Sequence, residues 1–391
     1  MDNLWSDEKA LECKNDLDLR VYTSNLLGQN DELVLHGGGN TSVKTHIEGE
    51  EVLLVKGSGW DLVSIEAEGF SPVYLDTLLD MAKLEKLSDS DMVKEQKAAM
   101  LDESAPNPSV EAILHALIPY KFVDHTHADA IVTISNSKSG KENIKNVFPN
   151  FLIVDYIMPG FELAHKIYEM TKGLDWSSID GIILHNHGVF TFDDSAKNAY
   201  DKMIFAVSKA EEFLDKNAVV HIEHNYVHSD CDIARVVNTL SEVKGHEVHI
   251  AINQTPLAAF YASQDNLKEF ASRGVLTPEH IIRTKRVPLI MEDTDLIGGL
   301  EKYMKEYEAY FKRNENGETM LNTAPNYMII KNLAVVSFGR TREEAKIIYD
   351  IVEHTMLAVL RADKLGGYES ISEKDSFEME YWELEQAKLK K

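Results

Sequence analysis

The sequence contains only two cysteines, Cys13 and Cys231. Two distant thiols exclude both a disulfide framework and a thiolate zinc site. No run of apolar residues approaches the roughly 18 needed to cross a membrane. The opening MDNLWSDEKALECKNDLD lacks the basic and apolar regions of a secretory signal. We therefore expect a cytoplasmic protein with no membrane partner.

Positive charge is scarce as well: 40 Lys and Arg stand against 65 Asp and Glu, for a formal net charge of −25. A polyanion would be repelled on average, so no nucleic-acid partner is expected. A small anionic substrate stays compatible with this charge if a local pocket supplies backbone N–H groups or lysines. The 391 residues and 44% hydrophobic content are typical of a globular chain with two domains.

The first domain is predicted to span residues 1–225. Strand-like and helical stretches alternate there with glycine turns between them, which indicates a mixed α/β fold. Strands are predicted at KFVDHTHA and FLIVDYIMPG, and a β-ribbon at IDGIILHNHGVFTF. Helices are predicted over residues 5–29 and 73–101, from about Ser109, and after a cap at Asp193, Asp194 or Ser195.

Residues 226–391 form the second predicted domain. Part of its sequence is similar to part of the first domain. One constant offset pairs Asn186 with Asn332 and Phe192 with Phe338, and a fainter one pairs Pro149 with Pro278 and Pro159 with Pro288. Either this domain is a degenerate copy, or two strand–turn–helix units merely resemble each other. In both cases Leu333 replaces His187, so the chemistry is expected in the first half.

Histidines are the first candidate metal ligands. His125 and His127 lie two apart, and alternate residues of a strand point to the same side. Neutral imidazoles suit zinc, and a third histidine would complete a site with an open coordination position. LHNHG supplies either His185 or His187, and the spacing does not decide between them. The alternative is that these are ordinary strand histidines.

Three further features are candidate parts of the same site. Glu111 is expected in the first turn of a helix, either as a carboxylate favoured by the helix dipole or as a general base. His115 lies four residues later, on the same helical face. The turns HGGGNTS and KGSG offer backbone N–H groups that could bind an anion, although neither matches a P-loop or dinucleotide fingerprint.

The motifs GGGNTS, KGSGWDL, PSVEAILH, HTH and NHG, in this order, resemble the class II aldolase/adducin family over about residues 10–220. The resemblance is closest to rhamnulose-1-phosphate aldolase and to the aldolase part of aldolase/short-chain-dehydrogenase fusion proteins. It implies a three-layer α/β/α fold with a mixed central sheet, plus a C-terminal α/β domain. No GxGxxG motif is found, so no nicotinamide reaction is expected.

The resemblance also implies roles for particular residues. Zinc, with manganese or cobalt as alternatives, would be held by His125, His127 and His187. Glu111 would be the catalytic carboxylate, and Glu162 matches a second carboxylate if a one-residue gap is allowed. The phosphate or an equivalent anion would lie against Gly39, Asn40, Ser58, Gly59 and Ser109. Val110 stands where smaller members of the family have a second serine, which removes one hydroxyl donor.

The expected reaction is retro-aldol cleavage of a ketose 1-phosphate of the rhamnulose or fuculose type. A metal-stabilised enediolate would give dihydroxyacetone phosphate and an aldehyde, in a homo-oligomeric enzyme whose only other partner is its sugar substrate. Alternatives with the same fold are a sugar-phosphate 4-epimerase and a 3-oxo-acid decarboxylase. A non-catalytic adducin-like interaction module is the alternative of another class, and it predicts loss of the metal ligands.

Overall fold

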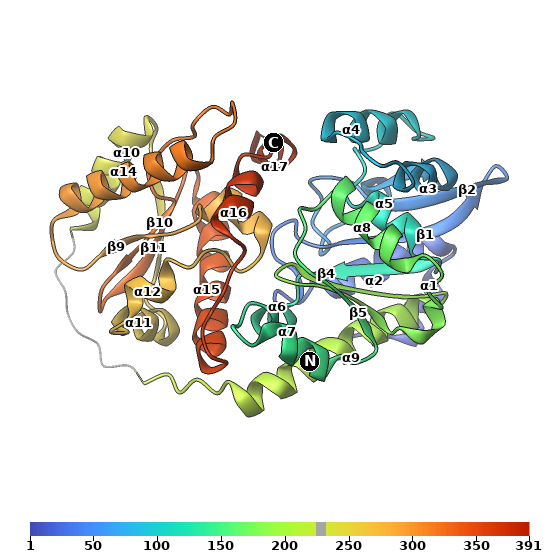
Figure 1. Cartoon of the computed structure of the whole chain (residues 1–391), viewed down its shortest axis with the longest axis horizontal. Coiled ribbons are helices and arrows are strands. Elements are labelled where there is room, and N and C mark those ends of the chain that lie inside the picture. Colours follow the sequence, from blue (N-terminus) through green and yellow to red (C-terminus); the bar gives the residue numbers. More distant parts are fainter. Residues whose placement is uncertain (224–231, 391) are drawn as a thin grey trace. The chain divides into compact units, whose positions relative to one another are not determined.

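The computed structural model describes residues 1–223 and 232–390 (Figure 1). The chain splits into two compact units: Met1–Ser135 with Lys141–Phe213, and Asn136–Gly140 with Leu214–Lys391. The predicted boundary at 225/226 and Cys231 lie outside the described residues. Within the described part, no helix is both long and apolar enough to cross a membrane.

The first unit is built on a seven-stranded mixed sheet, so the predicted mixed α/β fold is confirmed. Its strand order is β3-β2-β1-β4-β7-β6-β5, with only the β5–β6 pair parallel. The strands are β1 (Asn40–Ile47), β2 (Glu50–Lys56), β3 (Phe70–Tyr74), β4 (Phe122–Thr126), β5 (Phe151–Val154), β6 (Gly181–Leu184) and β7 (Gly188–Asp193). β4 therefore lies at the centre of the sheet, between β1 and β7.

Nine α-helices accompany this sheet in the described first part of the chain (Figure 1). They are α1 (Asp7–Glu12), α2 (Asp16–Gly28), α3 (Leu75–Ala82), α4 (Asp89–Ala98), α5 (Ala112–Leu117), α6 (Asp129–Ser135), α7 (Gly140–Val147), α8 (Phe161–Thr171) and α9 (Ala196–Asn217). Ser195 caps α9, as one of the three predicted alternatives, because its hydroxyl accepts the backbone N–H of Asn198.

Two of the predicted helices are wrong as single elements. Residues 5–29 form α1 and α2, because the Asn15 side chain accepts the N–H of Asp18 and starts a new helix. Residues 73–101 hold the end of β3 and two helices, and Ser88 caps the second by accepting the N–H of Asp91. A capping side chain within an apolar stretch thus starts a new helix, even where the helical spacing of apolar residues continues.

The second unit has a four-stranded mixed sheet of order β8-β11-β10-β9. Its strands are β8 (His249–Asn253), β9 (Leu289–Met291), β10 (Tyr327–Ile330) and β11 (Ala334–Gly339). Its α-helices are α10 (Ile233–Lys244), α11 (Pro256–Ser263), α12 (Leu267–Ala271), α13 (Ile281–Thr284), α14 (Leu296–Asn314), α15 (Arg342–Lys364), α16 (Glu373–Glu380) and α17 (Glu383–Gln386). Apolar residues of α10 and α14 pack on β10 and β11 in one core cluster.

The two sheets share a topology that supports the interpretation of an internal copy. In the β6–β7 hairpin Ile183 faces Val189, and in the β10–β11 hairpin Ile329 faces Val335, which is the register of the stronger sequence offset. Each hairpin turn contains an asparagine with positive φ, Asn186 at 59° and Asn332 at 62°. Each hairpin also has a parallel neighbour at one edge and an antiparallel neighbour at the other.

The fainter offset, which pairs Pro159 with Pro288, is not the structural one. Leu152 of β5 faces Ile182, and Leu289 of β9 faces the equivalent residue, Met328. Leu152 therefore corresponds to Leu289. The prolines lie outside the strands, so their equal spacing did not give the correct alignment of the two units. By the same reasoning β8 corresponds to β4. Val336 and Phe190 are equivalent in the two hairpins, and they face Ile252 of β8 and His125 of β4, respectively.

Candidate metal centre

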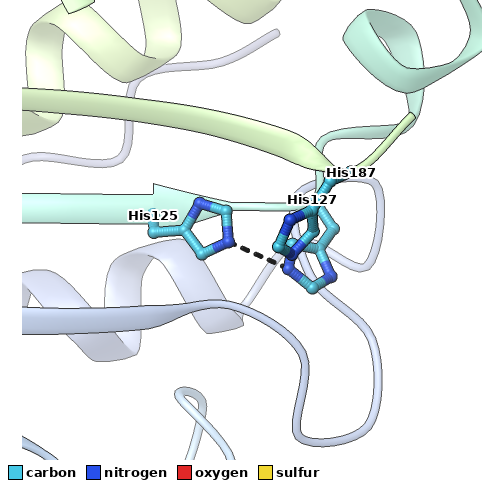
Figure 2. Close-up of side chains that lie close together, drawn as sticks. All are labelled: His125, His127 and His187. Carbon is cyan, nitrogen blue, oxygen red and sulfur yellow. Dashed lines mark hydrogen bonds between the residues drawn. The ribbon is translucent and has the colours of Figure 1, made fainter. Parts of the chain in front are cut away.

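Three histidines come together at the end of β4 in the first unit (Figure 2). His125 belongs to β4, His127 follows the last residue of that strand, and His187 lies in the turn between β6 and β7. One ring nitrogen from each lies within 4.8 Å of the other two, and the Nε2 atoms of His125 and His127 are 3.0 Å apart. His125 and His187 are buried and His127 is half-buried.

The orientation of His125 is fixed by the neighbouring strand. Its Nδ1 lies 3.1 Å from the carbonyl oxygen of Val189. A carbonyl only accepts, so Nδ1 must carry the hydrogen, and Nε2 keeps a lone pair directed at the other two histidines. The ring also stacks on Phe190 at a centroid distance of 4.0 Å. This arrangement is common for histidines that bind metals.

The structure separates the two histidines of LHNHG, which spacing alone left open. His187 joins the cluster, whereas the Nδ1 of His185 contacts the Asn186 side chain at 3.2 Å and the ring lies outside the cluster. Burial lowers the pKa of His185. The left-handed conformation of Asn186 makes the tight turn between the two strands, and asparagine tolerates that conformation.

Position 188 needs a glycine because a larger side chain would not fit there, and not because the backbone takes an unusual conformation. A Cβ atom at this position would lie 2.4 Å from the carbonyl oxygen of Thr126 and 2.9 Å from Cε1 of His125. It would also lie 3.1 Å from Cδ2 of His127. The tight turn before Gly188 is made by Asn186, which has the positive φ. At the paired positions the second unit has Ala334 for Gly188 and Leu333 for His187.

Glu111 lies beside the histidine cluster, and its side chain is 6% exposed. Its Oε2 is 3.6 Å from Nε2 of His125, and its Oε1 is 4.0 Å from Nε2 of His187. The residue precedes α5 as its N-cap, so the prediction that it lies inside a helix opening near Ser109 is wrong by one turn. Pro108 pairs with Gly57 as an isolated β-bridge, which keeps this segment extended up to Ser109.

The predicted anion-binding residues lie on three segments that meet near Glu111. Asn40 Nδ2 donates to Glu111 Oε2 at 2.7 Å and to Ser109 Oγ at 3.2 Å. The N–H of Ser109 donates to the carbonyl of Lys56, and that of Ser58 to the carbonyl of Asn107. These contacts bring the KGSG turn against Ser109.

The two glycines of this group have positive φ, 63° at Gly39 and 90° at Gly59. A Cβ on Gly39 would lie 2.7 Å from the carbonyl oxygen of His125, so this glycine allows β1 to start close to the histidine strand. Gly59 is exposed.

Glu162, the second predicted carboxylate, is exposed in the first turn of α8. Within the described residues, no hydrogen bond or ion pair joins it to the histidines or to Glu111. The structure therefore does not bring Glu162 into the cluster formed by the other predicted residues.

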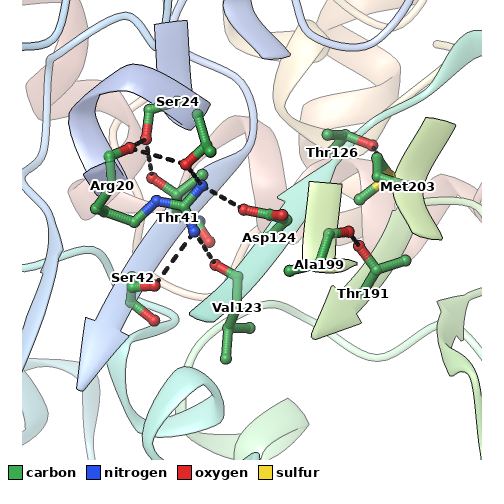
Figure 3. A network of polar contacts seen from close by, with 12 residues as sticks. Arg20, Ser24, Thr41, Ser42, Val123, Asp124, Thr126, Thr191, Ala199 and Met203 are labelled. Carbon is green, nitrogen blue, oxygen red and sulfur yellow. Dashed lines mark hydrogen bonds and ion pairs between the residues drawn. The ribbon is translucent and has the colours of Figure 1, made fainter. Parts of the chain in front are cut away.

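The opposite face of β4 holds a buried ion pair that the sequence did not reveal (Figure 3). Arg20 of α2 contacts Asp124 at 2.6 Å, and neither side chain is exposed. The same guanidinium donates to the carbonyls of Ser42 and Val123, which face each other across β1 and β4. Arg20 thus ties together the two strands that carry Asn40 and His125.

Lys44 supports the segment of Glu111 from the other end of α5. Its ammonium group donates to the carbonyls of His115, Ile118 and Tyr120 at 2.9, 2.6 and 3.0 Å. These carbonyls lie at or beyond the last turn of α5, where a helix has no further N–H groups of its own to offer them. A cation at this end is favoured by the helix dipole as well.

Comparison with known proteins decides the family. The family model described as "Class II Aldolase and Adducin N-terminal domain" matches residues 19–214. The chain belongs to the class II aldolase/adducin family. A second model of this family, "Aldolase class II, second domain", matches residues 229–389.

Two relatives place the chain within the family. The chain is 30% identical over 423 residues to a Bacillus subtilis (strain 168) protein named uncharacterized oxidoreductase YuxG, covering 99% of this chain and 60% of that relative. It is 43% identical to the solved N-terminal class II aldolase domain of a conserved protein from Thermoplasma acidophilum, with a TM-score of 0.51. That match covers 55% of this chain and 99% of the solved one.

The residues of this class II aldolase fold fit a bound metal ion. Three neutral imidazoles are a donor set that suits zinc, cobalt or manganese, and one of them has its tautomer set by a backbone carbonyl. The adjacent Glu111 Oε1 is buried and makes no hydrogen bond within the described residues. Such an oxygen is stabilised by a nearby cation, so the cluster is a candidate metal centre.

Proposed function

We propose that this chain is a metal-dependent aldolase that cleaves a ketose 1-phosphate, of the rhamnulose or fuculose type, to dihydroxyacetone phosphate and an aldehyde. The observation that carries the proposal is the convergence of His125, His127 and His187 beside the buried carboxylate of Glu111. The chemistry is assigned to the domain over residues 1–225. A homo-oligomeric state belongs to the same proposal.

The metal, zinc in the first instance, would be held by the three histidines. When bound, it supplies a Lewis acid that stabilises negative charge developing on the oxygens of the substrate. Neutral histidines carry no negative charge, so they do not offset the positive charge of the ion as thiolates would. His125 keeps its acceptor nitrogen toward the site through the hydrogen bond to Val189.

Glu111 would hold and move the proton of the reaction. Cleavage of the carbon–carbon bond leaves an electron pair on the carbon next to the ketone, and a carboxylic acid group at this place can deliver a proton to it. The Nδ2 of Asn40 holds Oε2, so Oε1 is the oxygen available for that transfer. Glu162 would be the second carboxylate only if α8 or a substrate brought it closer.

The phosphate, or an equivalent anion, would lie against Gly39, Asn40, Ser58, Gly59 and Ser109. Backbone N–H groups of the glycine turns and the Ser109 hydroxyl are suitable donors. Val110 cannot supply the second hydroxyl. We therefore expect a weaker preference for phosphate over carboxylate than two serines would give, which keeps a 3-oxo-acid decarboxylase as the second candidate.

The test compares wild type with Glu111→Gln and Glu162→Gln, each loaded with zinc. Aldehyde release from rhamnulose 1-phosphate and fuculose 1-phosphate is measured, along with carbon dioxide release from a 3-oxo acid and 4-epimerisation of a sugar phosphate. Glu111→Gln is expected to lower kcat by about 10²–10⁴-fold while retaining the metal. Metal-loaded wild type that cleaves neither ketose phosphate would contradict the aldolase assignment, and the other two assays would then identify the reaction.

A further inference from the structure

A line of hydrogen bonds runs from the buried Ser42 to Glu111 through two other side chains. Ser42 Oγ lies 2.8 Å from Nδ1 of His115, and His115 Nε2 bonds to Oδ1 of Asn40. Asn40 Nδ2 then bonds to Glu111 Oε2 at 2.7 Å. Neither Ser42 nor His115 is exposed to solvent, and the proposed reaction does not otherwise use them.

The chemistry of these groups fixes the direction of every bond in the line. An ionised carboxylate only accepts, so Asn40 must turn its NH₂ group toward Glu111 and its carbonyl oxygen toward His115. That oxygen also only accepts, so His115 must carry its hydrogen on Nε2. Nδ1 is then an acceptor and takes the hydroxyl hydrogen of Ser42.

His115 is held as a neutral ring in this position. Burial lowers its pKa well below the ordinary value of 6.5, and the positive charges of Lys44 and Arg20 lower it further. The ring also makes an edge contact with Phe190, with centroids 5.4 Å apart. One proton on one nitrogen is therefore the state that the surroundings favour.

The orientation of Asn40 has a second consequence at Ser109. The Ser109 oxygen accepts from Asn40 Nδ2 at 3.2 Å and from the backbone N–H of Glu111 at 3.3 Å. A hydroxyl has two lone pairs, so these two bonds occupy its acceptor capacity. Its single hydrogen is left to point elsewhere, which makes Ser109 a donor for a ligand oxygen.

We propose that His115 is a positioning residue of the active site, which through its Nε2–H tautomer holds Asn40 with the NH₂ group toward Glu111 and Ser109. This orientation anchors Glu111 Oε2 and turns the Ser109 hydroxyl into a donor for the anionic group of the substrate. The inference rests on the proposed function, since it takes Glu111 as the proton-transferring group. The other neutral tautomer, with its hydrogen on Nδ1, would place the Nε2 lone pair against Oδ1 and would break the line.

The first test is the tautomer of His115 in the zinc-loaded wild-type protein. Selective ¹⁵N labelling of histidine and long-range ¹H–¹⁵N spectroscopy distinguish Nε2–H, Nδ1–H and imidazolium, and His115→Gln identifies the signal. We expect the Nε2–H form. An Nδ1–H or imidazolium form would overturn the inference, whether or not the protein is an aldolase.

The second test is kinetic and uses three variants. His115→Phe keeps the ring without its nitrogens, and His115→Gln restores a donor near Nε2. His165→Gln, on α8, is the matched control at a half-buried histidine outside the site. We expect His115→Phe to lose about 10–100-fold in kcat/KM with its zinc content unchanged, and His115→Gln to recover most of that loss.

The outcomes separate the two proposals. Full activity of His115→Phe would overturn the positioning role and leave the aldolase assignment intact. Equal losses in His115→Phe and His115→Gln would also overturn it, because the restored donor would then have no effect. Absence of aldolase activity in the wild type would overturn the proposed function, and the tautomer would then report on the hydrogen-bond line alone.

Discussion

Arg20 and Asp124 form an ion pair 2.6 Å long in which neither side chain is exposed to solvent. Asp124 adjoins His125 on β4, and its side chain lies on the opposite face of that strand. Two charges in such a place are stable only as a pair, because each would otherwise be buried without a partner. The pair therefore connects the packing of α2 on the sheet to the strand that carries the first metal ligand.

Removal of one partner of this pair is expected to destabilise the first unit strongly. Arg20→Met leaves the Asp124 carboxylate buried and unpaired, and the free energy of unfolding should fall by about 3–5 kcal/mol. Urea unfolding followed by circular dichroism measures this change. Lys83→Met, which breaks the exposed contact with Asp80, is the control and should change nothing measurable. An equally small effect of Arg20→Met would show that the buried pair contributes no stability.

Gly188→Ala is expected to remove metal binding with little effect elsewhere. The added methyl group would overlap the carbonyl of Thr126 and the rings of His125 and His127, so at least one ligand must move. Zinc content after dialysis is the measurement. Gly173→Ala is the control for backbone strain without a steric clash, since its φ of 75° strains an alanine but a Cβ there meets no atom within 4 Å, and it should keep its zinc. Retention of zinc by Gly188→Ala would show that the ligands tolerate a shift.

The buried His115 predicts an acid-side loss of stability. The folded protein keeps this ring neutral below the ordinary pKa of 6.5, whereas the unfolded chain takes up a proton there. The unfolded state then binds more protons, so stability falls as the pH drops below about 6.5, by at most about 1.4 kcal/mol per pH unit.

Urea unfolding of wild type and His115→Gln between pH 5 and 7, with a chelator present, isolates this contribution. The difference in unfolding free energy between the two proteins should change in favour of the variant as the pH falls. A difference that is independent of pH would mean that His115 is protonated equally in both states.

Much of the site could be predicted from local patterns. His125 and His127 are two residues apart at a strand end, and β-strand geometry alone brings such side chains to one side. The hairpin of β6 and β7 could be predicted from its apolar runs, and the similar pattern pointed to the hairpin of β10 and β11. These features depend on short stretches of chain, where periodicity and turn residues determine the structure.

The remaining features depend on contacts between distant segments. Nothing local distinguishes His185 from His187; the difference arises because His187 meets β4, whereas His185 contacts the side chain of Asn186. The Arg20–Asp124 pair joins residues on α2 and β4, and the partners of His115 come from β1. Helix ends were misplaced at Asn15 and Ser88 because a single capping side chain outweighs a continuous apolar pattern.

The most direct test of the central claim is the metal content of three purified proteins: wild type, His127→Ala and His185→Ala. Each is exposed to zinc, dialysed and analysed for bound metal. The proposed centre predicts about one ion per chain in wild type and in His185→Ala, and its loss in His127→Ala. Wild type without bound metal, or equal retention by His127→Ala, would contradict the assignment of the three histidines as a metal centre.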